Sequence, residues 1–283
     1  MKASELLTEA LEYVRRFRGQ VFVVKLGGET MLDKDVLLSV AKDLMFLNLV
    51  GIKVVLVHGG GVEITEAMEK FGKKPTFVKG LRVTDRETMD IVEMVLTGKV
   101  NTELVSLINT QEGNAVGISG QSGSLFQASK VDSEIDLGYV GEVKKVNPKI
   151  VKTQLDNDYI PVISPIGLGP GGMTYNINAD TAAAKLAVAL NASKLILLTN
   201  VEGVLDKKNN LVKRLTLLET KKLIKQDFIK GGMIPKLEAC IHALENGVDR
   251  THIVKASRHA VLEEILTATG TGTMITKRKV KDE

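Results

Sequence analysis

The sequence is poor in cysteine and in aromatic residues. Cys240 is the single cysteine, which excludes an internal disulfide framework and any zinc cluster built from cysteines. Tryptophan is absent, and seven Phe and four Tyr provide few rings that could stack on bases. The net charge is only +4, so positive charge is not in large excess. These counts argue against an electrostatic nucleic-acid binder.

Long apolar runs are also missing. None approaches the roughly 20 residues that a membrane-spanning helix needs. The first 16 residues carry three glutamates, which is not typical of a signal peptide. We therefore predict a cytoplasmic protein with no membrane partner. With 283 residues, 44% of them apolar and 25% charged, the chain is long enough for a two-lobed globular unit with an ample core.

Short apolar runs alternate with longer segments of helical period. The runs are apolar throughout, as strands buried on both faces are. This alternation predicts an α/β fold with an open, mainly parallel sheet and helices on both faces. The predicted strands are residues 21–25, 53–57, 115–118, 160–164, 194–199 and 251–254. The predicted helices are residues 35–50, 84–109, 179–190 and 234–246, the second opened by a capping box of Thr84 and Glu87.

Residues 117–146 break this rhythm because they are rich in Gly and Ser. They predict β-hairpins beside the N-terminal half of the sheet, which could form a lid over a site. No low-complexity linker separates the two halves of the chain. We therefore expect two lobes that share one continuous sheet, with a boundary near residues 170–180.

Several catalytic motifs are absent. No Gly-x4-Gly-Lys-Ser/Thr occurs, which excludes a P-loop. Residues 167–172 match G-x-G-x-x-G, but neither a helix nor an acidic residue follows at the spacing of a dinucleotide site. The run His58-Gly-Gly-Gly61 lacks the nucleophile elbow that would make it an esterase loop. The four histidines show no metal-ligand spacing, so we name no metal-binding residue.

Three glycine-rich turns instead lie where strands end or helices begin, at residues 25–29, 58–61 and 231–236. Adjacent glycines let backbone N–H groups approach an anion closely. Each of the first two turns alone is explained by a tight strand-to-helix connection, but together they favour phosphate binding. Lys236 falls in the first turn of a predicted helix, where the helix dipole disfavours a cation. This position favours an anionic partner over a merely solvated lysine.

Three further polar residues lie near these turns. Asn178 or Asp180 could simply cap the helix that follows, but the Asp180 carboxylate could also hold two lysines in place. Arg82 precedes a predicted helix, and a guanidinium can bind a carboxylate through two parallel hydrogen bonds. From the residues alone, the chain is an α/β enzyme that handles the phosphate of a small molecule.

Seven motifs follow one another along the chain. They are Lys25-Leu-Gly-Gly28, His58-Gly-Gly-Gly61, Gly80-Leu-Arg82, Glu93-Met-Val-Leu96, Asp136-Leu-Gly138, Tyr175-Asn-Ile-Asn178 and Gly232-Met-Ile-Pro-Lys236. Together they resemble the acetylglutamate kinases of the amino-acid kinase family. The resemblance covers nearly the whole chain and implies that family's three-layer fold. It also implies transfer of the ATP γ-phosphoryl group to the side-chain carboxylate of N-acetyl-L-glutamate, in the second step of arginine biosynthesis.

The resemblance implies a role for each matching residue. Lys25 and Lys236 would stabilise the transition state, and Asp180 would orient both lysines. No general base is needed, because the accepting carboxylate is ionised at neutral pH. Mg²⁺ would be carried on the phosphates of ATP. The implied substrate-binding residues are Gly60, Gly61, Arg82 and Asn176. The implied nucleotide-binding residues are Gly27, Gly28, Asn200, Val201, Glu202, Gly203, Leu205, Gly232 and Met233.

An apolar stripe at helical spacing precedes the first strand, which could be a helix packed on its own core. The segment also resembles the N-terminal helix of arginine-inhibited acetylglutamate kinases, which implies a homohexamer built as a trimer of dimers. L-Arginine would then bind as an inhibitor near Tyr13, Glu264 and Gly270. The expected units are residues 1–19 for oligomerisation, 20–175 for N-acetylglutamate, and 176–283 for ATP and arginine.

Some questions stay open at this level. Many relatives have Lys-Asp where this chain has Gln121 and Ser122, so the roles of these two residues are undecided. Binding of a PII-type signalling protein is also undecided. The rival hypotheses are a related kinase that acts on glutamate, aspartate or carbamate, and a catalytically silent sensor of arginine or nucleotide. Retention of Lys25 and Lys236 favours an enzyme over a sensor.

Overall fold

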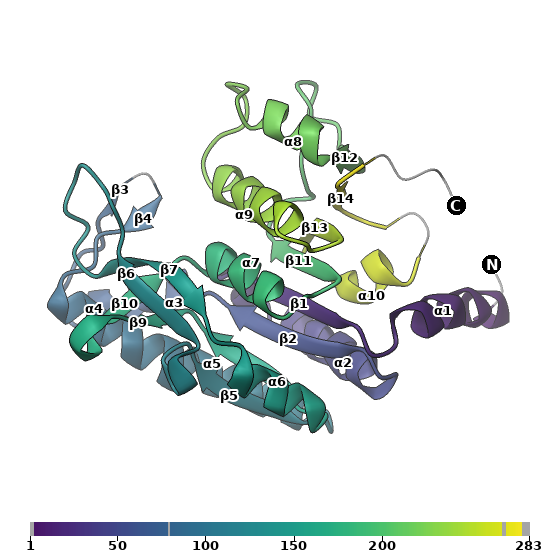
Figure 1. Ribbon diagram of the computed structural model, residues 1–283, viewed down its shortest axis with the longest axis horizontal. Helices are drawn as coiled ribbons and strands as arrows, with labels where there is room; N and C mark the ends of the chain where they lie inside the picture. The colour runs from purple at the N-terminus through teal and green to yellow at the C-terminus, as the bar shows by residue number, and fades with distance from the viewer. Residues whose placement is uncertain (1–2, 79, 268–269, 279–283) are drawn as a thin grey trace.

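A computed structural model describes residues 3–78, 80–267 and 270–278. Its centre is an eight-stranded sheet in the order β12-β14-β13-β11-β1-β2-β8-β5 (Figure 1). The strands are β1 (Val21–Leu26), β2 (Lys53–His58), β5 (Ala115–Ser119), β8 (Ile160–Ser164), β11 (Lys194–Thr199), β12 (Arg214–Thr216), β13 (Arg250–Lys255) and β14 (Thr273–Thr276). All neighbouring strands are parallel except β13 and β14. The six predicted strands and the mainly parallel sheet are confirmed.

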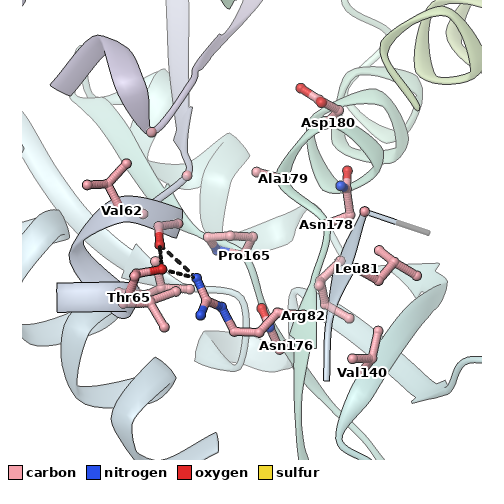
Figure 2. Close-up of a pocket in the computed structure, with 18 of the residues that line it drawn as sticks. Val62, Thr65, Leu81, Arg82, Val140, Pro165, Asn176, Asn178, Ala179 and Asp180 are labelled. Carbon is pink, nitrogen blue, oxygen red and sulfur yellow. Dashed lines mark hydrogen bonds between the residues drawn. The ribbon is translucent and has the colours of Figure 1, made fainter. Parts of the chain in front are cut away.

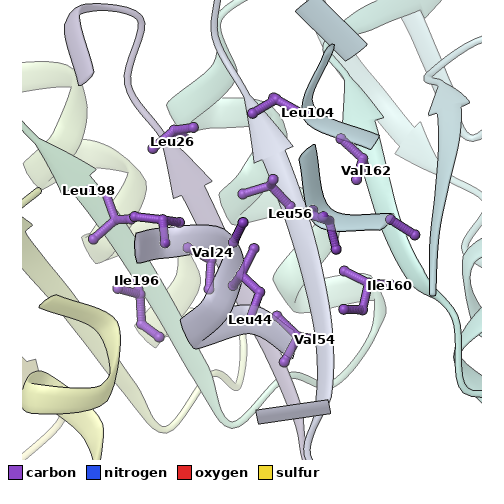
Figure 3. Packing of buried hydrophobic residues seen from close by; sticks show 14 of the residues in the cluster. Val24, Leu26, Leu44, Val54, Leu56, Leu104, Ile160, Val162, Ile196 and Leu198 are labelled. Carbon is purple, nitrogen blue, oxygen red and sulfur yellow. The ribbon is translucent and has the colours of Figure 1, made fainter. Parts of the chain in front are cut away.

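Helices cover both faces of this sheet, because successive strand residues point to opposite faces. Val24 and Leu26 of β1 pack with Leu44 of α2 on one face (Figure 3), whereas Val23 packs with Leu186 of α7 on the other. The first face carries α2 (Lys34–Leu49), α4 (Arg86–Glu93), α5 (Asn101–Asn109) and α10 (Ala260–Ile265). The second carries α6 (Lys149–Asp156), α7 (Ala179–Ala189) and α9 (Met233–Glu245). The other helices are α1 (Ala3–Phe17), α3 (Gly61–Lys70) and α8 (Leu217–Leu223).

The predicted capping box at Thr84 and Glu87 is wrong. Asp85 caps α4, because its carboxylate accepts a hydrogen bond from the Thr88 N–H at 2.8 Å. The Thr84 hydroxyl instead donates to the Arg82 carbonyl. The predicted single helix is also divided, since a π-helical segment, Met94–Val100, separates α4 from α5.

A small closed barrel lies beside the main sheet, formed by β6 (Phe126–Lys130), β7 (Val140–Val146), β9 (Ile166–Leu168) and β10 (Thr174–Ile177). The antiparallel pair β6 and β7 confirms a hairpin within residues 117–146. The barrel strands are hard to predict from sequence, because β7 and β9 each contain a glycine that packing dictates. A Cβ at Gly167 would lie 2.5 Å from the Cβ of Ala128, and one at Gly141 would lie 2.5 Å from that of Tyr175. The glycine run 167–172 therefore belongs to a barrel hairpin.

The helix α1 ends against the core. Phe17 is buried and meets the Phe22 ring edge-on at 5.3 Å, while Tyr13 stacks on Phe17 at 6.3 Å. The side chains of residues 3–7 lie outside the described part of the chain. Among the described residues, no helix combines the length and apolar character that crossing a bilayer requires.

Candidate active site

Two glycine-rich turns lie side by side at the carboxyl edge of the sheet, where open α/β sheets bind ligands. The strands β1 and β2 are parallel neighbours, with Leu26 opposite His58. The Gly59 N–H donates to the Leu26 carbonyl at 2.9 Å, and a Cβ added at Gly28 would lie 3.1 Å from the Gly61 nitrogen. A side chain at position 28 would therefore be crowded against the backbone of the second turn.

Asp180 lies between the two lysines. Its Oδ1 is 2.8 Å from the Lys25 Nζ, and its Oδ2 accepts a hydrogen bond from the Lys236 Nζ at 3.0 Å. Asn178, not Asp180, caps α7, because its side chain accepts the Thr181 N–H at 3.1 Å. The cap leaves the Asp180 carboxylate to bridge β1 and α9. Lys236 is the fourth residue of α9, and its ion pair with Asp180 offsets the unfavourable end of the helix dipole.

Burial and the neighbouring charges together set the pKa values of Lys25 and Asp180, which form a triad with Lys236. The exposed fractions of the side chains are 7% for Lys25, 5% for Asp180 and 15% for Lys236. Burial alone raises the pKa of Asp180, but the two ammonium groups outweigh it and lower that pKa below its usual value. Burial lowers the pKa of Lys25; Asp180 opposes this shift and Lys236 adds to it. Two ammonium groups and one carboxylate leave one net positive charge for an anion.

A first cavity of about 500 Å³ opens on one side of Lys25. Its wall includes the predicted substrate residues Gly60, Gly61, Arg82 and Asn176. Figure 2 shows Arg82 and Asn176 in this wall. A Cβ at Gly60 would lie 2.4 Å from the Leu96 Cδ2, so a side chain here would have to displace Leu96. The Asn176 Nδ2, from β10, donates to the Thr84 hydroxyl at 3.3 Å. The cavity wall also includes apolar residues that sequence analysis missed: Ile64, Phe77, Leu81, Leu96, Val140 and Pro165.

Arg82 is a second cationic residue in the wall of the first cavity, besides Lys25, and it is only 7% exposed. Its Nη2 donates to the Gly61 carbonyl at 2.7 Å and to the Thr65 hydroxyl at 2.8 Å. Its guanidinium lies 4.7 Å from the Phe77 ring centroid. In the described part of the chain no carboxylate forms an ion pair with Arg82. A buried guanidinium whose contacts are neutral is suited to an anionic ligand.

A second cavity of about 450 Å³ opens on the other side of Lys25. Six of the predicted nucleotide residues line it: Gly27, Gly28, Asn200, Val201, Gly232 and Met233. Lys25 and Gly28 belong to the walls of both cavities. The two cavities therefore meet at the lysine that Asp180 holds. Sequence analysis missed Thr30, Thr199 and Lys230 in the second wall. Lys230 directly precedes a glycine pair, which could have drawn attention to it.

Three other predicted nucleotide residues do not line this cavity. Glu202 is exposed and pairs with Lys255 at 2.5 Å. Gly203 has a φ of +150°, and a Cβ there would lie 2.7 Å from the side chain of Thr273. Leu205 forms an isolated bridge with Leu211. Nothing in their contacts requires a nucleotide, and their assignment stays a prediction.

Comparison with known proteins identifies the family. The model of the amino acid kinase family matches residues 20–255. This chain belongs to the amino acid kinase family. Within it, the acetylglutamate kinase of Halothermothrix orenii is 53% identical over 283 residues, with 98% of each chain covered. The resemblance to the acetylglutamate kinases is thereby confirmed.

Solved structures of N-acetylglutamate synthase from Neisseria gonorrhoeae share this amino acid kinase fold. The complex with coenzyme A and N-acetyl-glutamate has a TM-score of 0.89 at 28% identity and covers 99% of this chain. The complex with coenzyme A and L-arginine has a TM-score of 0.85 at 27% identity and covers 98%. This chain spans 65% and 66% of those two synthase chains.

Two of the predicted effector residues of this amino acid kinase lie together. Glu264 is buried on α10 and contacts the His252 Nδ1 at 2.7 Å; it accepts the N–H groups of Thr271 and Gly272. Burial raises the pKa of Glu264, but His252 and the two amides lower it to about 2. A Cβ at Gly270 would lie 2.8 Å from the Glu264 Oε2. Glu264 is therefore an ionised anchor of the 270–272 loop.

The third predicted effector residue, Tyr13, lies on α1. It stacks on Phe17, and the Nζ of buried Lys194 lies 4.6 Å from the Phe17 ring centroid. Burial and, to a smaller extent, Arg250 lower the pKa of Lys194 to about 7, and Glu264 opposes this shift. Sequence analysis missed Lys194, because its position in a buried apolar strand gives no sign of this environment.

His58 supports the second glycine turn without titrating near neutrality. Its Nδ1 lies 2.7 Å from the Gly59 carbonyl and its Nε2 lies 3.2 Å from the Asn101 Nδ2. A neutral ring fits both contacts, with the Nδ1–H donating and the Nε2 accepting. Burial lowers the pKa of His58 to about 4.

We expect this shift to appear in stability. Above pH 6.5 the ring is neutral in the folded and the unfolded chain. As the pH falls from 6.5 to 4, only the unfolded chain binds the proton, so His58 lowers the free energy of unfolding by about 1.4 kcal/mol per pH unit. Urea denaturation of His58→Gln between pH 7 and pH 4.5 should therefore give a shallower slope by about this amount. An unchanged slope would contradict the buried neutral ring.

Proposed function

We propose that this chain transfers the γ-phosphoryl group of ATP to the side-chain carboxylate of N-acetyl-L-glutamate. The observation that carries this proposal is the meeting of two cavities at Lys25, beside Asp180 and Lys236. One cavity suits a dianionic acceptor, because it holds the Arg82 guanidinium, and the other suits a polyphosphate. Relatives named acetylglutamate kinase support this choice of acceptor.

In this mechanism a carboxylate oxygen of the acceptor attacks the γ-phosphorus. The bond from that phosphorus to the β,γ-bridging oxygen breaks, and ADP and the acyl phosphate N-acetyl-L-glutamyl 5-phosphate form. The protein's part is positioning and charge neutralisation. Lys25 lies where the two cavities meet, Lys236 lies on the nucleotide side, and Asp180 fixes both. Mg²⁺ travels with the ATP phosphates as part of the substrate.

The residues of the two cavities have proposed contacts. Arg82 grips the α-carboxylate of N-acetylglutamate, and the Asn176 amide holds its backbone. The N–H groups of Gly60 and Gly61 approach the substrate, and those of Gly27 and Gly28 cradle the phosphates.

The direct test measures ADP release from Mg-ATP with four acceptors: N-acetylglutamate, glutamate, aspartate and carbamate. We expect turnover with N-acetylglutamate alone. Turnover with another acceptor in its place would assign the chain to a related amino acid kinase. Nucleotide binding without turnover of any acceptor would favour the sensor hypothesis.

We further propose that L-arginine inhibits the chain at Glu264, Gly270 and Tyr13, within a cytoplasmic homohexamer joined through residues 1–19. The ionised Glu264 carboxylate and the 270–272 loop lie together, and Lys194 lies against Phe17 of α1. The same assay with L-arginine tests this on the whole chain and on the chain lacking residues 1–18. The shortened chain should be an active dimer with much weaker inhibition. A hexamer that stays equally sensitive would overturn the proposal.

A further inference from the structure

Thr30 lies in a short 3₁₀ turn, Glu29–Leu32, directly after the first glycine pair. The turn connects β1 to α2, and Thr30 forms part of the wall of the second cavity, together with Lys25, Gly27 and Gly28. Neither the residue pattern nor the family resemblance assigned it a role. It nevertheless lines the same cavity as the two glycines that are predicted to bind phosphate.

The Thr30 hydroxyl is buried without a partner. The residue is 7% exposed, and its Oγ1 is inaccessible and has no hydrogen-bond partner in the described part of the chain. Buried hydroxyls are nearly always hydrogen-bonded, because an unpaired one keeps the cost of its lost hydration. An unpaired hydroxyl in the wall of a cavity therefore points to a ligand that pairs with it.

The hydroxyl also converges with the catalytic ammonium group. A Cβ added at Gly27 would lie 3.2 Å from the Leu198 carbonyl oxygen, 3.8 Å from the Lys25 Nζ and 3.8 Å from the Thr30 Oγ1. A phosphate oxygen would therefore lie on the side of this point away from the carbonyl. One small region above Gly27 is thus faced by a positive charge and by an O–H group. Both groups suit a phosphate oxygen, which accepts hydrogen bonds and carries negative charge. Glycine at position 27 keeps this region open.

We propose that the Thr30 hydroxyl donates a hydrogen bond to a β- or γ-phosphate oxygen of the nucleotide in the second cavity. This inference rests on the proposed kinase function and adds a nucleotide-binding residue to it. Thr30 acts by binding the end of the nucleotide that reacts. It should therefore discriminate between nucleotides by their phosphate chain and leave N-acetylglutamate binding unchanged.

The test compares Thr30→Val, which removes the hydroxyl at nearly constant shape, with Thr30→Ser, which retains it. Thr251→Val is the matched control, because Thr251 is fully buried in β13 and lines neither cavity. Titration calorimetry with Mg-AMP-PNP and with AMP measures binding directly. Thermal melting with and without Mg-AMP-PNP serves as the second measurement, and Thr30→Ala replaces the valine variant if that variant does not fold.

We expect Thr30→Val to bind AMP-PNP about tenfold more weakly or worse, the loss typical of a hydrogen bond to a charged group. AMP affinity and the KM for N-acetylglutamate should stay within about twofold, and Thr30→Ser and Thr251→Val should bind AMP-PNP nearly as the wild type does. Without nucleotide, Thr30→Val should melt no lower than wild type, since the hydroxyl it loses has no partner. Unchanged AMP-PNP binding by Thr30→Val, or an equal loss in Thr30→Ser, would overturn the proposal. Failure of wild-type turnover would instead count against the kinase function, since the binding comparison needs no acceptor.

Discussion

Replacing Lys236 with alanine is expected to lower kcat by about 10²–10³-fold, the effect of removing one pre-positioned donor from a transition state. The KM for N-acetylglutamate should change far less. Lys236 lines the nucleotide cavity and not the acceptor cavity, and Asp180 holds its ammonium group at 3.0 Å. Negative charge shifts toward the leaving phosphate only as the reaction proceeds, so an ammonium group there acts mainly on kcat.

Steady-state kinetics with each substrate varied in turn separates these effects. Lys221→Ala is the matched control, because Lys221 is an exposed lysine of α8 that pairs with Glu245 at the end of α9, outside both cavities. Asp180 keeps Lys25 as a partner in Lys236→Ala, so the variant should fold. An unchanged kcat would remove Lys236 from the mechanism.

The central strands could be predicted because their sequence agrees with their burial. Val23 and Val24 point to opposite faces, both are buried, and both are apolar, so the run reads as a strand covered on both sides. The glycine turns could also be predicted, because paired glycines directly after a predicted strand indicate the carboxyl edge of the sheet. What the residues could not decide was which residue caps α7, since Asn178 and Asp180 both suit a helix start.

The remaining elements depend on contacts between distant segments. The short strands β12 and β14 exist through pairing with each other, and Leu215 lies opposite Ile275, sixty residues away. Gly141 and Gly167 suggest loops by composition, although Tyr175 and Ala128 exclude any side chain there. Asp85 rather than Thr84 caps α4, since the Thr84 hydroxyl is already used by the Arg82 carbonyl. The strand pairing, the packed glycines and the helix cap therefore cannot be predicted from neighbouring residues in the sequence.

The same limit applies to the candidate site. The lysines and glycines were found because their chemistry is unusual at strand and helix ends. Thr30 was missed, because nothing in the sequence shows that its hydroxyl is buried without a partner in a wall that it shares with Lys25. Lys194 was missed because only the folded chain brings it to Phe17. A functional residue can thus be predicted from sequence when its residue type alone suggests the role. It cannot be predicted when the role depends on the contacts that the folded chain creates around it.

Arg82→Ala is expected to raise the KM for N-acetylglutamate by about 10²-fold, the loss typical of a buried charged contact, with a smaller change in kcat. The Arg82 guanidinium lines the acceptor cavity and not the nucleotide cavity. Its protein contacts are neutral: the Gly61 carbonyl, the Thr65 hydroxyl, the Met68 sulfur and the Phe77 ring. A bound α-carboxylate would provide the anion that these contacts do not.

Two variants sharpen this prediction. Arg82→Lys keeps the positive charge but loses the planar fork, so its KM should lie between those of the wild type and of Arg82→Ala. Arg86→Ala is the matched control, because Arg86 is exposed and pairs with Asp90 one helical turn away. The KM for ATP should be nearly constant across the series, since Arg82 does not reach the second cavity. A loss confined to kcat would show that Arg82 acts on the reaction and does not hold the acceptor.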